Sequence, residues 1–371
     1  MKNNGRVGLD IRLWSHPGIG RYIRDLIGAM VNLKGLDYFH FLGYRKDLEI
    51  FLKTSKPKAS YQEVSSRIYS LREQWEMARV AKSLPLLHVP HFNIPVARKE
   101  KLVVTVHDLI YLHDAKASKS RWGKHYVQFL FRQIEKKRAL VLAVSEYTKN
   151  DLLNAFPRIP AQNVFVTHEA ASELFQPIEE KETLEKIKNK HKLSKPFVLF
   201  VGSLKAHKNI PALIRAVESM RTEKKLDIDL VIVGRRDFKN KELWKTIQKC
   251  RTYVKYLGEL PDEDLAAIYN LASVFVLPSF LEGFGLPVLE AMACGTPVLV
   301  SNRASLPEIA GKAGLVFDPA RIDELSALLY NVLTNENLRK SMIRAGLTRA
   351  GEFSWLKTAE KTLEVYQRAL E

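Results

Sequence analysis

Two glutamates, Glu282 and Glu290, stand eight positions apart in a glycine-rich stretch of the chain. Gly283, Gly285 and Pro287 lie between them. Glycines let a backbone approach a ligand closely, and the free N–H groups of a helix N-terminus bind phosphate. A carboxylate beside such a site accepts hydrogen bonds from sugar hydroxyls. The stretch therefore indicates a site for a sugar attached to a diphosphate, with an ordinary strand–loop–helix turn and exposed glutamates as the alternative.

The flanking residues predict the elements that position these glutamates. Residues 273–278, Ser-Val-Phe-Val-Leu-Pro, form a short apolar run typical of a buried strand. Downstream, Pro287 suits the first turn of a helix, and Gly295 ends that helix. We expect Glu282 on the loop at the carboxyl end of the strand and Glu290 one turn into the helix.

The run from Glu282 to Val298, E-G-F-G-L-P-V-L-E-A-M-A-C-G-T-P-V, resembles the signature of retaining, nucleotide-sugar-dependent glycosyltransferases of family 4. The resemblance covers nearly the whole chain. It implies an α/β fold of the GT-B type, in which two Rossmann-like, doubly wound domains face each other across a cleft. We expect an acceptor-side domain at residues 1–176, a nucleotide-sugar donor domain at 177–352, and a terminal helix at 353–371 that crosses back to the first domain.

The resemblance also implies roles for individual residues. Glu290 is expected to bind the ribose hydroxyls, and Glu282 to hold the donor sugar together with the amides of the glycine loop. The expected catalytic residues are His107, Lys208 and Glu282. The residues expected to bind the nucleotide-sugar are Gly18, Gly20, Arg21, Asp108, Ser203, Arg235, Tyr256, Leu257, Gly283, Phe284, Gly285, Leu286, Val288 and Glu290.

Lys208 lies in a glycine-led loop, Gly202-Ser-Leu-Lys-Ala-His-Lys-Asn209, that follows an apolar strand. In the family a basic residue of this loop neutralises the donor diphosphate. An ammonium there offsets the charge that builds on the leaving phosphate. The sequence departs from the family pattern at Ser203 and at His207, where many members carry arginine. Charge stabilisation is therefore expected to rest on Lys208 together with Arg21.

Two further loops follow predicted strands in the amino-terminal half. The strand Val7–Ile11 leads to a G-x-G-R turn and a helix, an arrangement typical of the entrance to a nucleotide-binding fold. By resemblance, Gly18, Gly20 and Arg21 face the donor diphosphate. His107 and Asp108 follow the strand at 102–106, and in the family the histidine reaches the donor sugar.

The net charge of +17 is concentrated in the amino-terminal half. Residues 1–176 hold 28 Lys and Arg against 16 Asp and Glu, whereas the remainder holds 30 against 25. A basic surface attracts nucleic acid, an anionic membrane or a phosphorylated acceptor. A solvated lysine-rich surface is the alternative, and it stays open also for the basic, aromatic segment at 115–142.

Residues 66–84 predict a basic amphipathic helix. Ile68, Leu71, Trp75 and Ala78 fall on one side of it, with arginines elsewhere. By resemblance such a helix flanks the acceptor side, and a plain packing helix with a charged outer face is the alternative.

Length and composition fit two globular domains, with 371 residues, 46% hydrophobic and 27% charged. No apolar run reaches the roughly 18 residues of a transmembrane helix, and the first residues lack the apolar core of a signal peptide. Two cysteines, Cys250 and Cys294, give no disulfide framework or zinc spacing. We expect a cytoplasmic protein, peripheral at the inner face of the plasma membrane if the basic face binds lipid, with no metal and no cofactor besides the donor.

The motif V-H-D-L-I-Y, together with G-S-L-K-x-x-K-N, most resembles GDP-mannose-dependent mannosyltransferases of surface-polysaccharide and lipopolysaccharide assembly. The resemblance implies transfer of mannose from GDP-mannose to a glycan or lipid-linked acceptor, with retention of configuration. A UDP-sugar donor is the alternative. A more distant one is a nucleic-acid-binding protein that uses the basic half. The glycine loops at strand ends in both halves argue against it, and no nucleic-acid partner is expected. The oligomeric state stays open.

Overall fold

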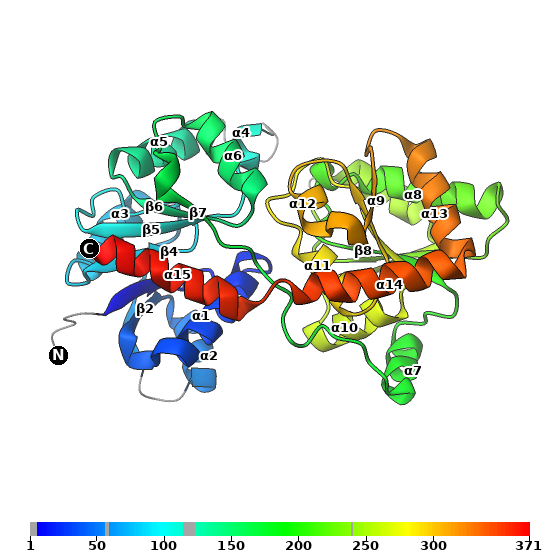
Figure 1. The fold of residues 1–371 in the computed structure, drawn as a ribbon, viewed down its shortest axis with the longest axis horizontal. Helices are drawn as coiled ribbons and strands as arrows, with labels where there is room; N and C mark the ends of the chain where they lie inside the picture. Colours follow the sequence, from blue (N-terminus) through cyan, green and yellow to red (C-terminus); the bar gives the residue numbers. More distant parts are fainter. Residues whose placement is uncertain (1–5, 56–58, 114–122, 239) are drawn as a thin grey trace. The chain divides into compact units, whose positions relative to one another are not determined.

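The computed structural model describes residues 6–55, 59–113, 123–238 and 240–371. The chain divides into two compact units, one of Met1–Glu169 with Trp355–Glu371 and the other of Ala170–Ser354. These boundaries lie a few residues from the expected 176 and 352. Each unit is a parallel sheet with helices on its faces (Figure 1). The two Rossmann-like domains expected from the sequence are confirmed.

The first unit contains a seven-stranded parallel sheet in the order β3-β2-β1-β4-β5-β6-β7. Most of its strands are continuous buried runs, as expected for a parallel sheet covered on both faces. The strands are β1 (Val7–Asp10), β2 (Phe39–Gly43), β3 (Ser60–Glu63), β4 (Leu86–Val89), β5 (Lys101–Val106), β6 (Leu140–Ala143) and β7 (Val164–Val166).

The helices of this unit cover the two faces of the sheet in distinct sets. They are α1 (Ile19–Lys34), α2 (Arg45–Ser55), α3 (Leu71–Val80), α4 (Ile110–His113), α5 (Gly123–Lys136), α6 (Glu146–Ala155) and α15 (Trp355–Leu370), with short 3-10 turns at Leu36–Tyr38 and Ala161–Asn163. Side chains of α3 and α5 share one core with Val104 and Val106 of β5. Thr105 points to the opposite face, because neighbouring strand residues alternate. There it contacts Tyr22 of α1, so α1 covers the face opposite to α3 and α5.

The terminal helix α15 belongs to the first unit, although it follows the second in sequence (Figure 1). The hydroxyl of Tyr366 lies 2.5 Å from Nδ1 of His88 on β4, and Nε2 of His88 lies 2.8 Å from Oγ1 of Thr105. Because these residues lie on the face covered by α1, α15 packs on the face opposite to α3 and α5.

The second unit contains a six-stranded parallel sheet in the order β10-β9-β8-β11-β12-β13. Its strands are β8 (Phe197–Val201), β9 (Asp229–Val233), β10 (Val254–Gly258), β11 (Val274–Leu277), β12 (Val298–Ser301) and β13 (Leu315–Phe317). Its helices are α7 (Lys181–Lys190), α8 (Ile210–Thr222), α9 (Lys241–Lys249), α10 (Asp262–Leu271), α11 (Leu286–Ala293), α12 (Leu306–Ala310), α13 (Ile322–Thr334) and α14 (Glu336–Gly351), with 3-10 turns at Ala206–Lys208 and Gly311–Ala313.

The strand order reverses between two neighbouring strands in each sheet. In the second unit the chain runs from β8 outward to β10 and then returns to place β11 on the other side of β8. In the first unit β1 and β4 stand in the same relationship. Loops at the carboxyl ends of such strand pairs diverge and leave room for a ligand. The structure therefore offers one such position in each unit.

The strand and helix predicted around the two glutamates are confirmed as β11 and α11. Gly285, with φ of 103°, is the residue before α11, and Pro287 lies in its first turn. The helix predicted at 66–84 is wrong in its extent, because α3 covers only Leu71–Val80. Its expected apolar side also does not pack, since Leu71 is 84% exposed and Trp75 is 75% exposed.

None of the helices in the described parts of the chain combines the length and apolar character needed to cross a bilayer. The first part of the basic segment at 115–142, up to residue 122, lies outside the described residues.

Candidate active site

The loops after β8 and β11 meet where the strand order of the second unit reverses. The backbone N–H of Phe280 donates to the carbonyl oxygen of His207 at 2.8 Å. Beside this link, Nζ of Lys208 lies 2.6 Å from Oε1 of Glu282. Both side chains are nearly buried, with exposed fractions of 14% and 12%. Two of the three expected catalytic residues thus form an ion pair at the predicted edge of the sheet.

The loop that carries Glu282 is held by serine hydroxyls on both sides. Ser279 donates to Oε1 of Glu282 at 2.6 Å, the same oxygen that Lys208 contacts. Ser305 donates to the backbone carbonyl oxygens of Glu282 and Phe284 at 3.1 and 2.8 Å. These bonds fix both the carboxylate and the backbone of residues 282–284 before any ligand binds.

The second glutamate of the pair is buried. Glu290 is 1% exposed, and its Oε2 accepts a hydrogen bond from the hydroxyl of Tyr269 at 2.9 Å. A turn with two solvent-exposed glutamates, the alternative left open by the sequence, is therefore wrong. Val288, expected to bind the nucleotide-sugar, has a fully buried side chain, and its N–H donates to the carbonyl of Gly285 at 2.8 Å.

The loops after β9 and β10 lie against the loop after β8. A Cβ atom on Gly234 would lie 2.2 Å from the carbonyl oxygen of Gly202, so only glycine allows this backbone approach. The N–H of Leu204 donates to the carbonyl of Arg235 at 3.0 Å, and the hydroxyl of Tyr256 donates to the carbonyl of Gly234 at 2.9 Å. Ser203, Arg235 and the last residues of β10, among them Tyr256 and Leu257, are thus brought to one edge of the sheet.

In the first unit, His107 follows β5 as expected and is held through both ring nitrogens. Nδ1 lies 3.1 Å from Oε1 of Glu169, and Nε2 lies 3.2 Å from the carbonyl oxygen of Pro90. Asp108 accepts a hydrogen bond from the N–H of Ile110 at 3.0 Å, at the start of α4. Glu169 was not predicted, because 62 residues separate it from the histidine that it contacts.

The two glycines of the G-x-G-R turn have different surroundings. A Cβ atom on Gly20 would lie 2.3 Å from the carbonyl oxygen of Trp14, and its N–H already donates to the carbonyl of His16 at 2.9 Å. Gly20 therefore serves the close packing of α1 on the preceding loop. A Cβ on Gly18 would meet nothing within 4 Å. Arg21, the third expected contact, is half-buried in the first turn of α1.

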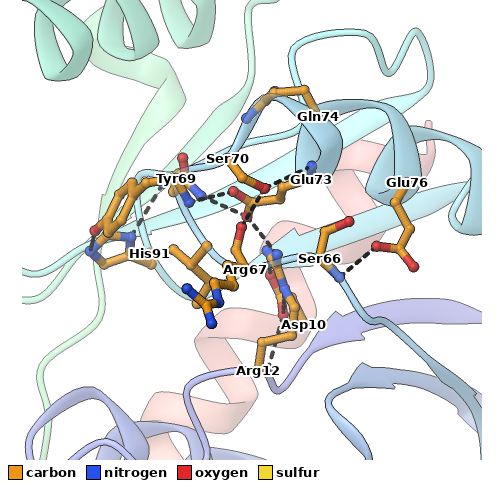
Figure 2. A network of polar contacts seen from close by, with 12 residues as sticks. Asp10, Arg12, Ser66, Arg67, Tyr69, Ser70, Glu73, Gln74, Glu76 and His91 are labelled. Atoms are coloured by element: carbon orange, nitrogen blue, oxygen red, sulfur yellow. Dashed lines mark hydrogen bonds and ion pairs between the residues drawn. The ribbon is translucent and has the colours of Figure 1, made fainter.

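A buried ionic network that was not predicted from the sequence lies at the strand-order reversal of the first unit (Figure 2). Arg12 donates to Asp10 through Nε and Nη2 at 2.8 and 2.6 Å, and through Nη1 to Glu73 at 2.5 Å. The side-chain amide of Asn93 also donates to Glu73, at 2.7 Å. Burial lowers the pKa of Arg12, but the attraction and hydrogen bonds of both carboxylates outweigh it, and the pKa is raised overall. The polar pattern Asp10-Ile-Arg12 at the end of a strand is the sequence signal from which this network could have been predicted.

Within the residues that the structure describes, no group of three or more His, Cys, Asp or Glu side chains is arranged to hold a metal ion. Lys208, Glu282 and Glu290 are among the charged side chains at the edge of the second sheet, together with Arg235.

Comparison with known proteins matches both units to glycosyltransferase families. Residues 17–170 match the model of "Glycosyltransferase Family 4", and residues 181–349 match that of "Glycosyl transferases group 1". The chain is 30% identical over 370 residues to the O-antigen chain mannosyltransferase B of Escherichia coli, covering 94% of this chain and 96% of that protein.

Two further likenesses differ in extent. The serotype-specific mannosyltransferase WbdA of Escherichia coli is 30% identical over 292 residues, 76% of this chain but 35% of WbdA. The structure of HepE from Anabaena with UDP and glucose superposes with a TM-score of 0.77 at 15% identity, covering 98% of this chain and all of that one. The fold is thus that of the GT-B enzymes, and the chain is a glycosyltransferase that belongs to family 4, in common with the O-antigen mannosyltransferase of Escherichia coli.

Proposed function

We propose that this enzyme transfers mannose from GDP-mannose, with retention of configuration, to a glycan or lipid-linked acceptor in surface-polysaccharide synthesis at the inner face of the plasma membrane. The observation that carries the proposal is the Lys208–Glu282 pair, which lies beside the N-terminus of α11. An ammonium and helix N–H groups suit a diphosphate, and a carboxylate suits sugar hydroxyls. The mannosyl donor is supported by the names of the two Escherichia coli relatives described above, both of which are mannosyltransferases.

Glu290 has the surroundings of a nucleoside-binding carboxylate. Its burial excludes a role as a solvated surface charge, and Tyr269 holds one of its oxygens. A carboxylate fixed in this way can accept hydrogen bonds from two ribose hydroxyls without a further loss of side-chain entropy on binding. The role of His107 toward the donor sugar stays a prediction, as does the retaining outcome, which rests on the family resemblance.

A donor panel tests the proposal. We would titrate the purified protein calorimetrically with GDP, UDP, GDP-mannose and UDP-glucose. GDP and GDP-mannose are expected to bind. Glu290→Gln should lower the affinity for both roughly 10- to 100-fold, because a hydrogen bond to a charged group contributes about 1.5–3 kcal/mol. Glu336→Gln, at an exposed position of α14, is the matched control and should bind as the wild type does. A preference for UDP would replace the donor, and no binding of any nucleotide would overturn the proposal.

The stereochemistry needs a separate measurement. Proton NMR of the first product formed from GDP-α-mannose should show an α linkage. A β linkage would contradict the retaining mechanism while leaving the donor assignment intact.

A further inference from the structure

The outward face of α3 carries two large apolar side chains one turn apart. Leu71 is 84% exposed and Trp75 is 75% exposed. Single apolar residues on a surface are ordinary, but a tryptophan and a leucine at i and i+4 form a continuous apolar strip. The opposite side of the same helix is packed, because Met77 and Val80 lie in the core of the first unit.

Polar contacts fix the rotation of α3, so Leu71 and Trp75 cannot turn inward. Glu73 is buried and accepts a hydrogen bond from the guanidinium of Arg12 (Figure 2). Gln74 accepts a hydrogen bond from the N–H of Val96 at 2.7 Å. Glu76 accepts bonds from two backbone N–H groups of the preceding loop, at 3.0 and 2.7 Å. The apolar strip is therefore presented by a rigid helix.

The same face is basic. Both acids of α3 are engaged elsewhere, since Glu73 is buried against Arg12 and Glu76 is bonded to the preceding loop. Helix α5 packs on the same side of the sheet and adds an apolar side chain, Phe129, which is 46% exposed. The exposed basic residues of α3, α5 and their flanks include Arg67, Arg72, Arg79, Lys82, Lys124, Arg132 and Lys136.

We propose that this surface, the outward face of α3 with the exposed side of α5 beside it, docks on an anionic lipid bilayer. Tryptophan and leucine flanked by basic residues are the composition of helices that lie in a membrane interface. Trp75 and Leu71 enter the boundary between headgroups and acyl chains, and the arginines bind lipid phosphates. The inference rests on the proposed function only in that a lipid-linked acceptor is presented at such a surface.

Charge argues against a second copy of this chain as the occupant. Two such faces brought together would oppose like charges, and neither helix offers exposed acids to pair with them. An anionic bilayer supplies the complementary charge, and each basic residue near its surface raises the affinity about fivefold.

Vesicle sedimentation of the full chain tests the docking surface. Wild-type protein should bind vesicles that contain phosphatidylglycerol, and bind vesicles of phosphatidylcholine alone at least tenfold more weakly. The double variant Leu71→Ser/Trp75→Ser should lose tenfold or more in affinity for the anionic vesicles. Arg72→Glu/Arg79→Glu should also lose tenfold or more, and should reduce the salt dependence of binding.

Leu356→Ser is the matched control. Leu356 is 51% exposed on α15, which packs on the opposite face of the sheet, so this variant should bind vesicles as the wild type does. An unchanged melting temperature shows that each variant is folded. Absence of binding to anionic vesicles, or equal binding by the Leu71/Trp75 variant, would overturn the proposal. Self-association that this variant abolishes, without lipid binding, would identify a second copy as the occupant and also overturn it.

Nucleotide titration of the same preparations separates this inference from the proposed function. Protein that binds anionic vesicles but no nucleotide refutes the proposed function and leaves the docking surface intact. Protein that binds GDP-mannose but no vesicle does the reverse.

Discussion

Lys208 and Glu282 are 74 residues apart in the chain, and their charged atoms lie 2.6 Å apart. The pair is nearly buried, with Ser279 donating to the same carboxylate oxygen. An anionic ligand at this edge must compete with Glu282 for the ammonium of Lys208. The pair thus holds the lysine in place while reducing its attraction for phosphate.

This competition predicts opposite effects of substitution at the two positions on the binding of free GDP. Glu282→Gln removes the competing negative charge and should tighten GDP about tenfold, which corresponds to about 1.4 kcal/mol. Lys208→Ala removes the cation and should weaken GDP by a similar factor. Both variants should lower turnover of the nucleotide-sugar. The loss should be about 100-fold for Lys208→Ala, because the charge on the leaving phosphate then lacks its cationic partner.

Calorimetry with GDP and a radiolabelled transfer assay measure the two effects. Lys205→Ala, an exposed lysine of the same loop, is the control and should leave both unchanged. Weaker GDP binding by Glu282→Gln would show that the carboxylate supports the nucleotide and does not compete with it.

The sequence was sufficient for elements whose signals are local. The apolar run that ends at Pro278 defines β11, and Pro287 and Gly295 define the start and the end of α11. The sequence also predicted that His107 and Lys208 follow strands. Because the carboxyl ends of parallel strands share one edge of a sheet, each residue could be placed at that edge. The contacts of His107 with Glu169 and of Lys208 with Glu282 were not predictable, because the two members of each pair are distant in sequence and become neighbours only through the order of the strands.

The helix α3 shows where a sequence pattern misleads. Leu71 and Trp75 have the spacing of a packed apolar side, yet Glu73 occupies the buried side. The buried carboxylate is stabilised by Arg12, which is 61 residues away, and no local pattern reveals that partner. Ser70 accepts a hydrogen bond from the N–H of Glu73 at 3.2 Å, so the helix begins at Leu71 and not at residue 66.

The Arg12–Glu73 pair should make a large contribution to the stability of the first unit when one partner is removed. Glu73→Ala removes one of the two carboxylates that offset the buried charge of Arg12, and it should lower the free energy of unfolding by about 3–5 kcal/mol. Replacing both partners by methionine should cost much less, because neither charge then stays buried alone. Urea unfolding followed by circular dichroism measures both.

Glu63→Ala provides the control for the loss of a carboxylate. Its ion pair with Arg45 is largely exposed, so the expected loss is about 0–1 kcal/mol. If the single and double variants of Arg12 and Glu73 were equally unstable, the two side chains would contribute through packing and not through their pairing.

His88 should make the stability of the first unit depend on pH. Its ring lies between Tyr366 and Thr105, and burial, followed by the nearby charge of His107, lowers its pKa to about 3. In the unfolded chain a histidine has a pKa of about 6.5, so below that pH the unfolded state binds the proton more readily. The stabilising effect of the neutral ring is therefore complete above about pH 6.5 and is lost as the pH falls toward 3. The slope from His88 is at most about 1.4 kcal/mol per pH unit.

His88→Gln keeps hydrogen-bonding groups but does not titrate, so its free energy of unfolding should fall less steeply with decreasing pH than that of the wild type. Urea unfolding at about pH 7, 5 and 4 measures this difference, which should reach about 1.4 kcal/mol per pH unit between pH 5 and 4. His125→Gln, at an exposed position of α5, should show the wild-type slope. Burial lowers the pKa of His91 to about 3 as well, so a residual slope in His88→Gln is expected. Equal slopes for His88→Gln and the wild type would mean that His88 takes up its proton in the folded protein, because the ring would then reach water despite its burial.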